Sequence, residues 1–378
     1  MKGERGDWRS YRTSHALLLL LLVTLEVFHF QKCVAPTARK FVMKLVLALI
    51  VATVIILGCN PPPLKAGRDP DLLALAQSIS LDEIVGRIDH MGLDAAHKRL
   101  FVAALGNDSV EVIDLSTGKV RQHIRNLRAP QAVGFAPESN RLAVANNGDG
   151  SLRLFDGSSL EQTAAIDLKD DADNVRYDAS SRRFWVGYGA GGLAAIDPSS
   201  GRQVADVKLN AHPESFQLET KGKRIFVNVP NASYIAVVDR GTATVIQKFR
   251  LTAARSNFPM ALDEADHRLI VGCRNPAKLL ILDTETFSTI AALDIVGDTD
   301  DVFYDAANKR TYVSGGEGYV TVIKQTSAND YEVSGQVATA RGARTSFFAT
   351  QTGRLYVAVP RRGWQKPELE VLTVTPKQ

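Results

Sequence analysis

One short phrase, written seven times, constrains this chain more than any other feature. It places an arginine before a run of apolar residues, as in "KRLFVA" at residues 98–103 and "KRIFVN" at residues 223–228. Successive copies lie 41 to 44 residues apart. That period is typical of one four-stranded blade, so the sequence predicts an all-β, seven-bladed β-propeller. The seven arginines are Arg99, Arg141, Arg183, Arg224, Arg268, Arg310 and Arg354.

Each repeated unit carries the pattern of four strands. An apolar or aromatic residue precedes each arginine by six positions, and the residues between them favour a tight turn, as in "DAAHK" after Leu93. Further on, an alternating apolar segment leads through a turn that begins with aspartate into another strand, as in "SVEVIDLSTGKV" from Ser109. Alternation with period two, interrupted by such turns, indicates antiparallel strands.

The two ends of the repeat region indicate how the ring closes. The last unit ends in "ELEVLTVTPKQ", which is too short for a fourth strand, and the segment "LAQSISLDE" from Leu75 precedes the first unit. We expect this segment to complete the seventh blade, giving one monomeric domain over residues 75–378. The alternative is an eighth partial blade or an open solenoid, which would leave both ends unpaired.

The N-terminal region predicts export. Residues 43–59 combine Met43-Lys44, an apolar core and Gly58-Cys59, which resembles a bacterial lipoprotein signal with Cys59 as the lipidated residue. A single membrane-spanning anchor over residues 41–57 is the alternative. Residues 1–42 then represent an over-extended start or an extra leader. Residues 60–74 begin "NPPPLKAG", which favours an extended tether.

The net charge of the folded part argues against a nucleic-acid partner, and its cysteine content argues against an internal disulfide. Residues 1–59 hold eight of the 45 basic and three of the 41 acidic side chains, which leaves 37 basic and 38 acidic residues after them. A net charge of −1 argues against nucleic acid as a partner. Only Cys59 and Cys273 remain in the mature chain, so we expect no internal disulfide.

The phrases "RLFVA", "SVEVIDLSTGKV" and "RLYVA", together with "KRTYVS" from Lys309, resemble the YVTN-repeat family of bacterial seven-bladed propellers. The resemblance covers about residues 75–378. It implies an exported protein of the cell envelope, on the surface or in the periplasm. It says little about the biochemical role, because one fold hosts many functions.

Equivalent positions of a ring face one axis, so a column of the repeat predicts what lines the channel mouth. The column four residues before the apolar marker is rich in carboxylates, which suit Ca²⁺, another cation or an amine. The alternative is a rim of solvated loop acids. The column is Asp89, Gln131, Asp173, Glu214, Phe258, Asp300 and Arg344, with His90, Asn174, Ser215 and Asp301 adjacent and Asp170, Asp171 and Asp298 nearby. Among them, Asp173 and Asp300 are the metal candidates.

A long loop of the seventh unit, "VPRRGWQKPELE", is the second candidate. Arg361, Arg362 and Trp364 combine positive charge with an aromatic plate, which suits sugars or anionic groups, although Trp364 could equally pack on a neighbouring blade.

Catalysis has weaker support in the sequence. Some seven-bladed propellers of this kind are lactonases, and that resemblance would make His212, Glu214 and Arg344 the base and oxyanion partners. No haem, phosphate-loop or zinc motif is present, so no cofactor is identified. The sequence therefore favours a binding or interaction module with an unknown protein or small-molecule partner.

Overall fold

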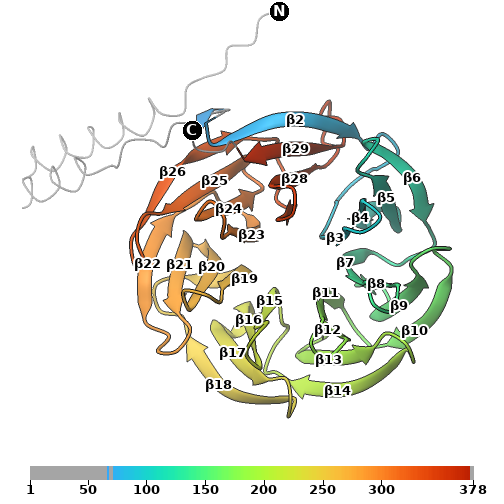
Figure 1. Cartoon of the computed structure of the whole chain (residues 1–378), viewed down its shortest axis with the longest axis horizontal. Coiled ribbons are helices and arrows are strands. Elements are labelled where there is room, and N and C mark those ends of the chain that lie inside the picture. The colour runs from blue at the N-terminus through green and yellow to red at the C-terminus, as the bar shows by residue number, and fades with distance from the viewer. Residues whose placement is uncertain (1–65, 68–70, 375–378) are drawn as a thin grey trace, which may run out of the picture. The chain divides into compact units, whose positions relative to one another are not determined.

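The computed structural model describes residues 66–67 and 71–374. Seven antiparallel sheets surround one axis as the blades of a propeller (Figure 1), which confirms the fold expected from the repeat. In the first six blades the chain runs from the strand nearest the axis to the outermost strand. The strands of blades one to three are β3 (Met91–Asp94), β4 (Arg99–Ala104), β5 (Ser109–Asp114), β6 (Lys119–Ile124), β7 (Pro130–Ala136), β8 (Arg141–Asn146), β9 (Ser151–Asp156), β10 (Gln162–Asp167), β11 (Ala172–Asp178), β12 (Arg183–Tyr188), β13 (Gly192–Asp197) and β14 (Arg202–Lys208).

Blades four to six repeat this order, and short 3₁₀ turns follow the second strand in two of the blades. These turns are η2 (Leu105–Asn107) in blade one and η3 (Pro230–Ala232) in blade four. The strands of blades four to six are β15 (Phe216–Leu218), β16 (Arg224–Val229), β17 (Tyr234–Asp239), β18 (Thr244–Arg250), β19 (Arg255–Asp263), β20 (Arg268–Asn275), β21 (Ala277–Asp283), β22 (Thr289–Asp294), β23 (Thr299–Asp305), β24 (Arg310–Gly315), β25 (Tyr319–Gln325) and β26 (Tyr331–Ala338).

The seventh blade joins the two ends of the propeller. It contains β27 (Ser346–Ala349), β28 (Arg354–Val359) and β29 (Glu368–Val374), with β2 (Leu73–Ser80) as its outermost strand. β2 runs antiparallel to β29, and the two lie side by side in Figure 1. The predicted closure is therefore confirmed, with the strand starting two residues before Leu75. A short strand that the sequence did not predict, β1 (Ala66–Gly67), adds to blade six parallel to β26.

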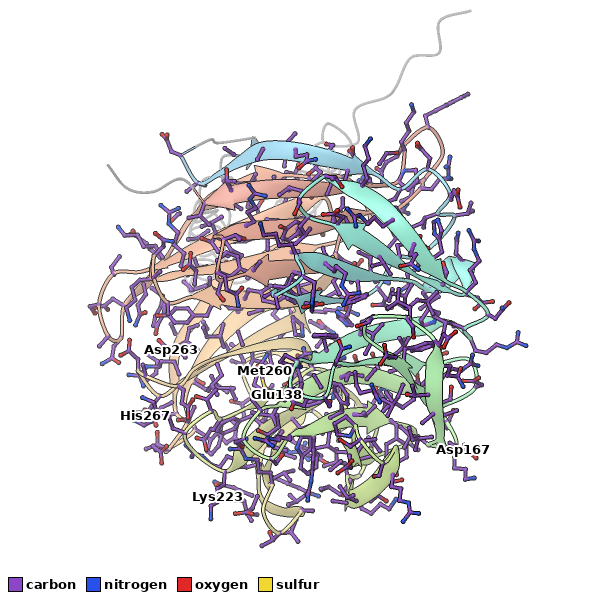
Figure 2. The ribbon with its side chains drawn as sticks, turned by 45° about the vertical axis from the view of Figure 1, so that its right-hand side comes forward. Glu138, Asp167, Lys223, Met260, Asp263 and His267 are labelled. Carbon is purple, nitrogen blue, oxygen red and sulfur yellow. The ribbon has the colours of Figure 1, made fainter. Side chains whose placement is uncertain are left out.

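The core consists of apolar clusters, one between each pair of neighbouring blades in the described part of the chain. In β4, Leu100 and Val102 pack toward blade seven, whereas Phe101 and Ala103 pack toward blade two. Both faces of each inner sheet are thus buried, which explains why the repeated phrase is apolar at consecutive positions. The outermost strands are more polar, and Figure 2 shows Asp167 of β10 at the periphery.

The predicted leader, Cys59 and residues 60–65 and 68–70 of the predicted tether lie outside the described residues, while the rest of the tether contains β1 and the start of β2. Among the residues that are described, the structure contains no helix of sufficient length and apolarity to span a membrane.

Candidate functional site at the channel mouth

One mouth of the central channel opens into a pocket of about 330 Å³, which we call the mouth pocket. All seven blades contribute residues to this pocket. These residues lie at or near the start of the innermost strand of each blade and in neighbouring segments on the same face. Its lining residues are Arg87, His90, Gln131, Asp171, Asp173, His212, Glu214, Asn231, Phe258, Arg274, Asp300 and Arg344. Nine of these twelve are ionisable, so the pocket suits a small and highly polar ligand.

The column of equivalent positions converges on this mouth. Six of its seven members line the mouth pocket, and the seventh, Asp89, is fully buried against Arg87 and His90. The residues converge because each lies in, or a few residues before, the first strand of its blade, as Asp173 does in β11 and Asp300 in β23. The structure thus brings together side chains that are up to 255 residues apart in the sequence.

Asp89, His90 and Asp301 form a buried chain of charges. Arg87 Nη2 lies 2.7 Å from Asp89 Oδ2, but neither oxygen of Asp89 accepts a hydrogen bond of good geometry from the described residues. His90 Nδ1 lies 3.3 Å from Asp301 Oδ1, and the backbone N–H of Ser346 donates to Asp301 Oδ2 at 2.8 Å. Burial raises the pKa of Asp89 to about 7, although the positive charges of His90 and Arg87 act to lower it. Burial alone would lower the pKa of His90, yet Asp301 and Asp89 raise it to about 10.

Asp300 lies between two arginines. Arg274 Nη2 pairs with Oδ1 of Asp300, and Arg344 Nε lies 3.2 Å from Oδ2. Arg274 is further fixed by Phe258, whose ring centroid lies 3.6 Å from the guanidinium carbon, and by the carbonyl of Thr299. Burial raises the pKa of Asp300, although His90 and the two arginines act to lower it. Two fixed cations therefore balance this carboxylate without any metal.

Asp173, His212 and Glu214 lie together on the side of blades three and four. One ligand atom from each, a carboxylate oxygen or a ring nitrogen, lies within 4.8 Å of the others. His212 Nδ1 donates to the carbonyl of Gly189 at 2.6 Å, and its Nε2 lies 3.6 Å from Asp173 Oδ2. Burial would lower the pKa of His212, but Asp173 and the Gly189 carbonyl raise it to about 9. Burial and the charge of Asp173 raise the pKa of Glu214 to about 8.

Further polar groups surround this cluster. Asp171 accepts hydrogen bonds from Gln131 and Asn147, and burial raises its pKa. Asn174, which is 1% exposed, donates to Asp173 Oδ1 at 3.3 Å, while its own amide oxygen accepts no hydrogen bond from the described residues. The ring of carboxylates is therefore not a uniformly solvated rim.

Beyond the mouth pocket, the channel contains a second cavity of about 340 Å³, which His90 also lines. Arg176 lines this cavity. Burial lowers the pKa of Arg176, while the negative charges of Asp301 and Asp173 act to raise it. Met260 also lines the cavity, and Figure 2 shows it nearer the middle of the molecule than His267 of the same blade.

The long loop of blade seven adjoins the mouth pocket through a side pocket of about 260 Å³, which shares Arg87 and Arg344 with it. Arg361 donates to the carbonyls of Asp82 and Ile84, so its guanidinium holds the segment after β2. Arg362 lines the side pocket, and Trp364 is fully exposed at 103%. Packing of Trp364 on a neighbouring blade is thereby excluded, whereas its role as a contact residue remains a hypothesis.

Arg87 and Arg274 are the charged residues that the repeat alignment did not single out. Arg87 lies two residues before the column, and Arg274 lies near the end of the second strand of its blade, β20, rather than at the start of the first strand. A second column, drawn through the last residues of the second strands, would have found Arg274, because those strand ends reach the same face.

No protein-family model matches the sequence. Protein NirF from Stutzerimonas stutzeri is 22% identical in an alignment of 182 residues. The alignment covers 44% of this chain and 46% of NirF, so the match spans less than half of that relative. The chain is a seven-bladed propeller distantly related to NirF.

Solved structures show the same fold. A chain of Kuenenia stuttgartiensis hydrazine synthase is similar with a TM-score of 0.57 and 14% identity, covering 73% of this chain and 94% of that one. A chain of a mitotic checkpoint complex is similar with a TM-score of 0.68 and 11% identity, covering 84% and 97%. At such identities the likeness concerns the fold alone.

Proposed function

We propose that this chain is a binding module of the cell envelope that holds a small, highly charged ligand in the mouth pocket. The observation that carries the proposal is the convergence of ionisable side chains from six of the seven blades on one pocket of about 330 Å³. Such a lining is costly unless the charges are paired with one another or with a ligand. A purely structural mouth needs no such concentration of charge.

The arrangement of charge indicates what the ligand carries. Arg274 and Arg344 lie on the side of blades five to seven, whereas Asp171, Asp173 and Glu214 lie on the side of blades three and four. A ligand with an anionic group near the arginines and a cationic group near the carboxylates would complement both sides. Guanidinium groups pair especially well with carboxylate and phosphate.

The location is part of the proposal. The lipoprotein-like pattern of residues 43–59 and the Pro-rich segment after it support a lipid anchor at Cys59 on the non-cytoplasmic side, and the distant relation to NirF suggests a periplasmic protein. We expect Cys59→Ala to move the protein from the membrane fraction to the soluble fraction, or to leave an unprocessed precursor. Unchanged fractionation and mass would favour an uncleaved membrane-spanning helix.

The ligand is tested by what the purified protein carries. The full-length chain is isolated in detergent from its own host, denatured, and the released small molecules are identified by mass spectrometry. We expect one species that is enriched with the wild type and lost from Arg274→Gln. The matched control is Arg255→Gln, an exposed arginine of the same blade that lies outside the mouth pocket. Equal recovery from both variants would contradict the proposal.

Lactone hydrolysis is the second candidate, and one observation favours it. His212, Glu214 and Arg344 line the same pocket, although the sequence separates them by up to 132 residues. A base there could take a proton from water as it adds to the lactone carbonyl, and the proton would then pass to the alkoxide that leaves. Hydrolysis of a lactone panel that Glu214→Gln abolishes would establish this function over simple binding.

A further inference from the structure

We propose that Asp173, His212 and Glu214 bind one divalent transition-metal ion of the Zn²⁺ type. The site is part of the mouth pocket, so the inference rests on the proposed function and names the cationic part of what the pocket holds. The three side chains come from two blades, with Asp173 in β11 and the other two in the loop before β15. Their ligand atoms lie within 4.8 Å of one another.

The orientation of His212 supports a role as ligand. Its Nδ1–H donates to the carbonyl of Gly189 at 2.6 Å, which fixes the ring and leaves Nε2 directed toward Asp173. Histidines that bind metals almost always donate their other ring N–H to a carbonyl or carboxylate in this way. In the neutral ring, Nε2 then carries the lone pair that a metal requires.

The spacing of the three side chains is close to that of a metal site. Ligands at about 2.0 to 2.1 Å from a tetrahedral Zn²⁺ lie about 3.4 Å from one another. His212 Nε2 and Asp173 Oδ2 are 3.6 Å apart, and the ligand atoms of all three residues lie within 4.8 Å of one another. Binding of a metal therefore requires the ligand atoms to approach one another, and Glu214 lines the pocket wall with a side chain that has several rotatable bonds.

The balance of charge singles out this part of the mouth. Asp89 and Asp300 each have an arginine within 3.2 Å, but in the described part of the chain no arginine or lysine forms an ion pair with Asp173 or Glu214. Arg176 acts on Asp173 only from the channel below. His212 is the partner that forms an ion pair with Asp173 among the described residues, and a dication would add positive charge beside two carboxylates that have no arginine or lysine partner.

The donor set favours a transition metal over Ca²⁺. Ca²⁺ takes six to eight oxygen ligands, whereas Zn²⁺ is commonly held by imidazole nitrogen together with carboxylate oxygen. Three protein ligands leave at least one coordination position open toward the mouth pocket. An anionic ligand that also contacts the arginines of blades five to seven can reach that position.

The experiment uses the full-length chain in detergent, stripped of metal with a chelator. Zn²⁺ is titrated by calorimetry, and Co²⁺ is titrated while the visible absorption that reports nitrogen and oxygen coordination is recorded. We expect one equivalent of either metal per chain. We expect Glu214→Gln and His212→Gln each to weaken binding at least 10- to 100-fold, since loss of even an outer-shell partner has an effect of that size. Asp298→Asn, which removes an equal charge from the same face but outside the triad, should bind as the wild type does.

Several outcomes would overturn the inference. These are the absence of a Co²⁺ spectrum, unchanged binding by both triad variants, or a Ca²⁺-dependent rise in melting temperature that His212→Gln leaves intact. Circular dichroism of each variant excludes misfolding as the cause of lost binding. Because co-purification of a small molecule is measured separately, failure of the metal site and failure of the proposed ligand function give different results.

Discussion

At the scale of single residues, the mouth of this propeller keeps buried charges by alternating their signs. Asp301 accepts the backbone N–H of Ser346 and lies next to His90, and His90 in turn lies next to Asp89. An ion left alone in such surroundings costs several kcal/mol even after relaxation, so each member depends on the next. The chain of charges that runs from the exposed Arg87 to the buried Asp301 therefore contributes to the fold as well as to the shape of the pocket.

We expect His90→Gln to destabilise the protein by about 3 to 5 kcal/mol near pH 6, because it removes the partner of the buried carboxylate of Asp301. The pKa of His90 is raised to about 10 from 6.5, so its stabilising charge is fully present below pH 6.5 and is lost as the pH rises through 10. The difference between wild type and variant should shrink accordingly between pH 7 and pH 10, as measured by urea unfolding.

The matched control for this prediction is His97→Gln. His97 also pairs with an aspartate, Asp94, but its side chain is 65% exposed on a turn between the first two strands of blade one. An exposed pair contributes no more than about 1 kcal/mol. A His90 variant that is no less stable than the His97 variant, or a difference that does not change with pH, would contradict the role given to the buried pair.

The residues that line the mouth could largely be predicted from the sequence, because equivalent positions of the repeat occupy equivalent places around the axis. The column from Asp89 to Arg344 converges as the repeat requires, and its neighbours His90 and Asp301 lie with it. The pairing pattern could not be predicted. Which carboxylate meets an arginine depends on side chains such as Arg274, which reaches from the end of β20 to Asp300 of the next blade in a contact that no repeat describes.

At the scale of elements, the recurring arginine marks a hairpin with a fixed backbone. In six of the seven units the residue just before it has a positive φ, which is uncommon outside glycine and asparagine. These residues are Lys98, Asn140, Arg182, His267, Lys309 and Gly353. The phrase thus begins with glycine or a polar residue in these units, because the turn needs a left-handed position that disfavours β-branched side chains.

The arginine itself braces the turn. Arg99 pairs with Asp94 at 2.6 Å, and Arg224 pairs with Glu219 at the same distance, in each case across the hairpin. In other units the arginine instead reaches the aspartate that ends the third strand, as Arg141 does with Asp156 at 3.0 Å. The sequence therefore shows the location of each hairpin, but the choice of partner depends on which acid lies closer in that blade.

At the scale of the whole molecule, the ring closes through strands from both ends of the propeller. β2 pairs with β29 from Leu73 opposite Val374 to Ser80 opposite Glu368, and Arg310 of blade six donates to the carbonyl of Leu72. The repeat period predicted this closure, since the last unit lacked one strand. β1 carries no copy of the repeated phrase and pairs through its backbone, so no sequence pattern indicated it.

The closure predicts that the propeller unfolds as one unit that needs its N-terminal strand. β2 buries Leu73 and Ile79, each worth about 1.5 to 3 kcal/mol, and covers the backbone edge of β29. A chain that begins at Asp82 should therefore lose at least 3 kcal/mol of stability and tend to aggregate, whereas a chain that begins at Leu72 should melt as the full-length protein does. A synthetic peptide of residues 72–81 should restore part of the lost melting temperature in proportion to its concentration. Equal melting temperatures for the two truncated chains would show that β29 needs no partner and that the ring is closed by packing between blades alone.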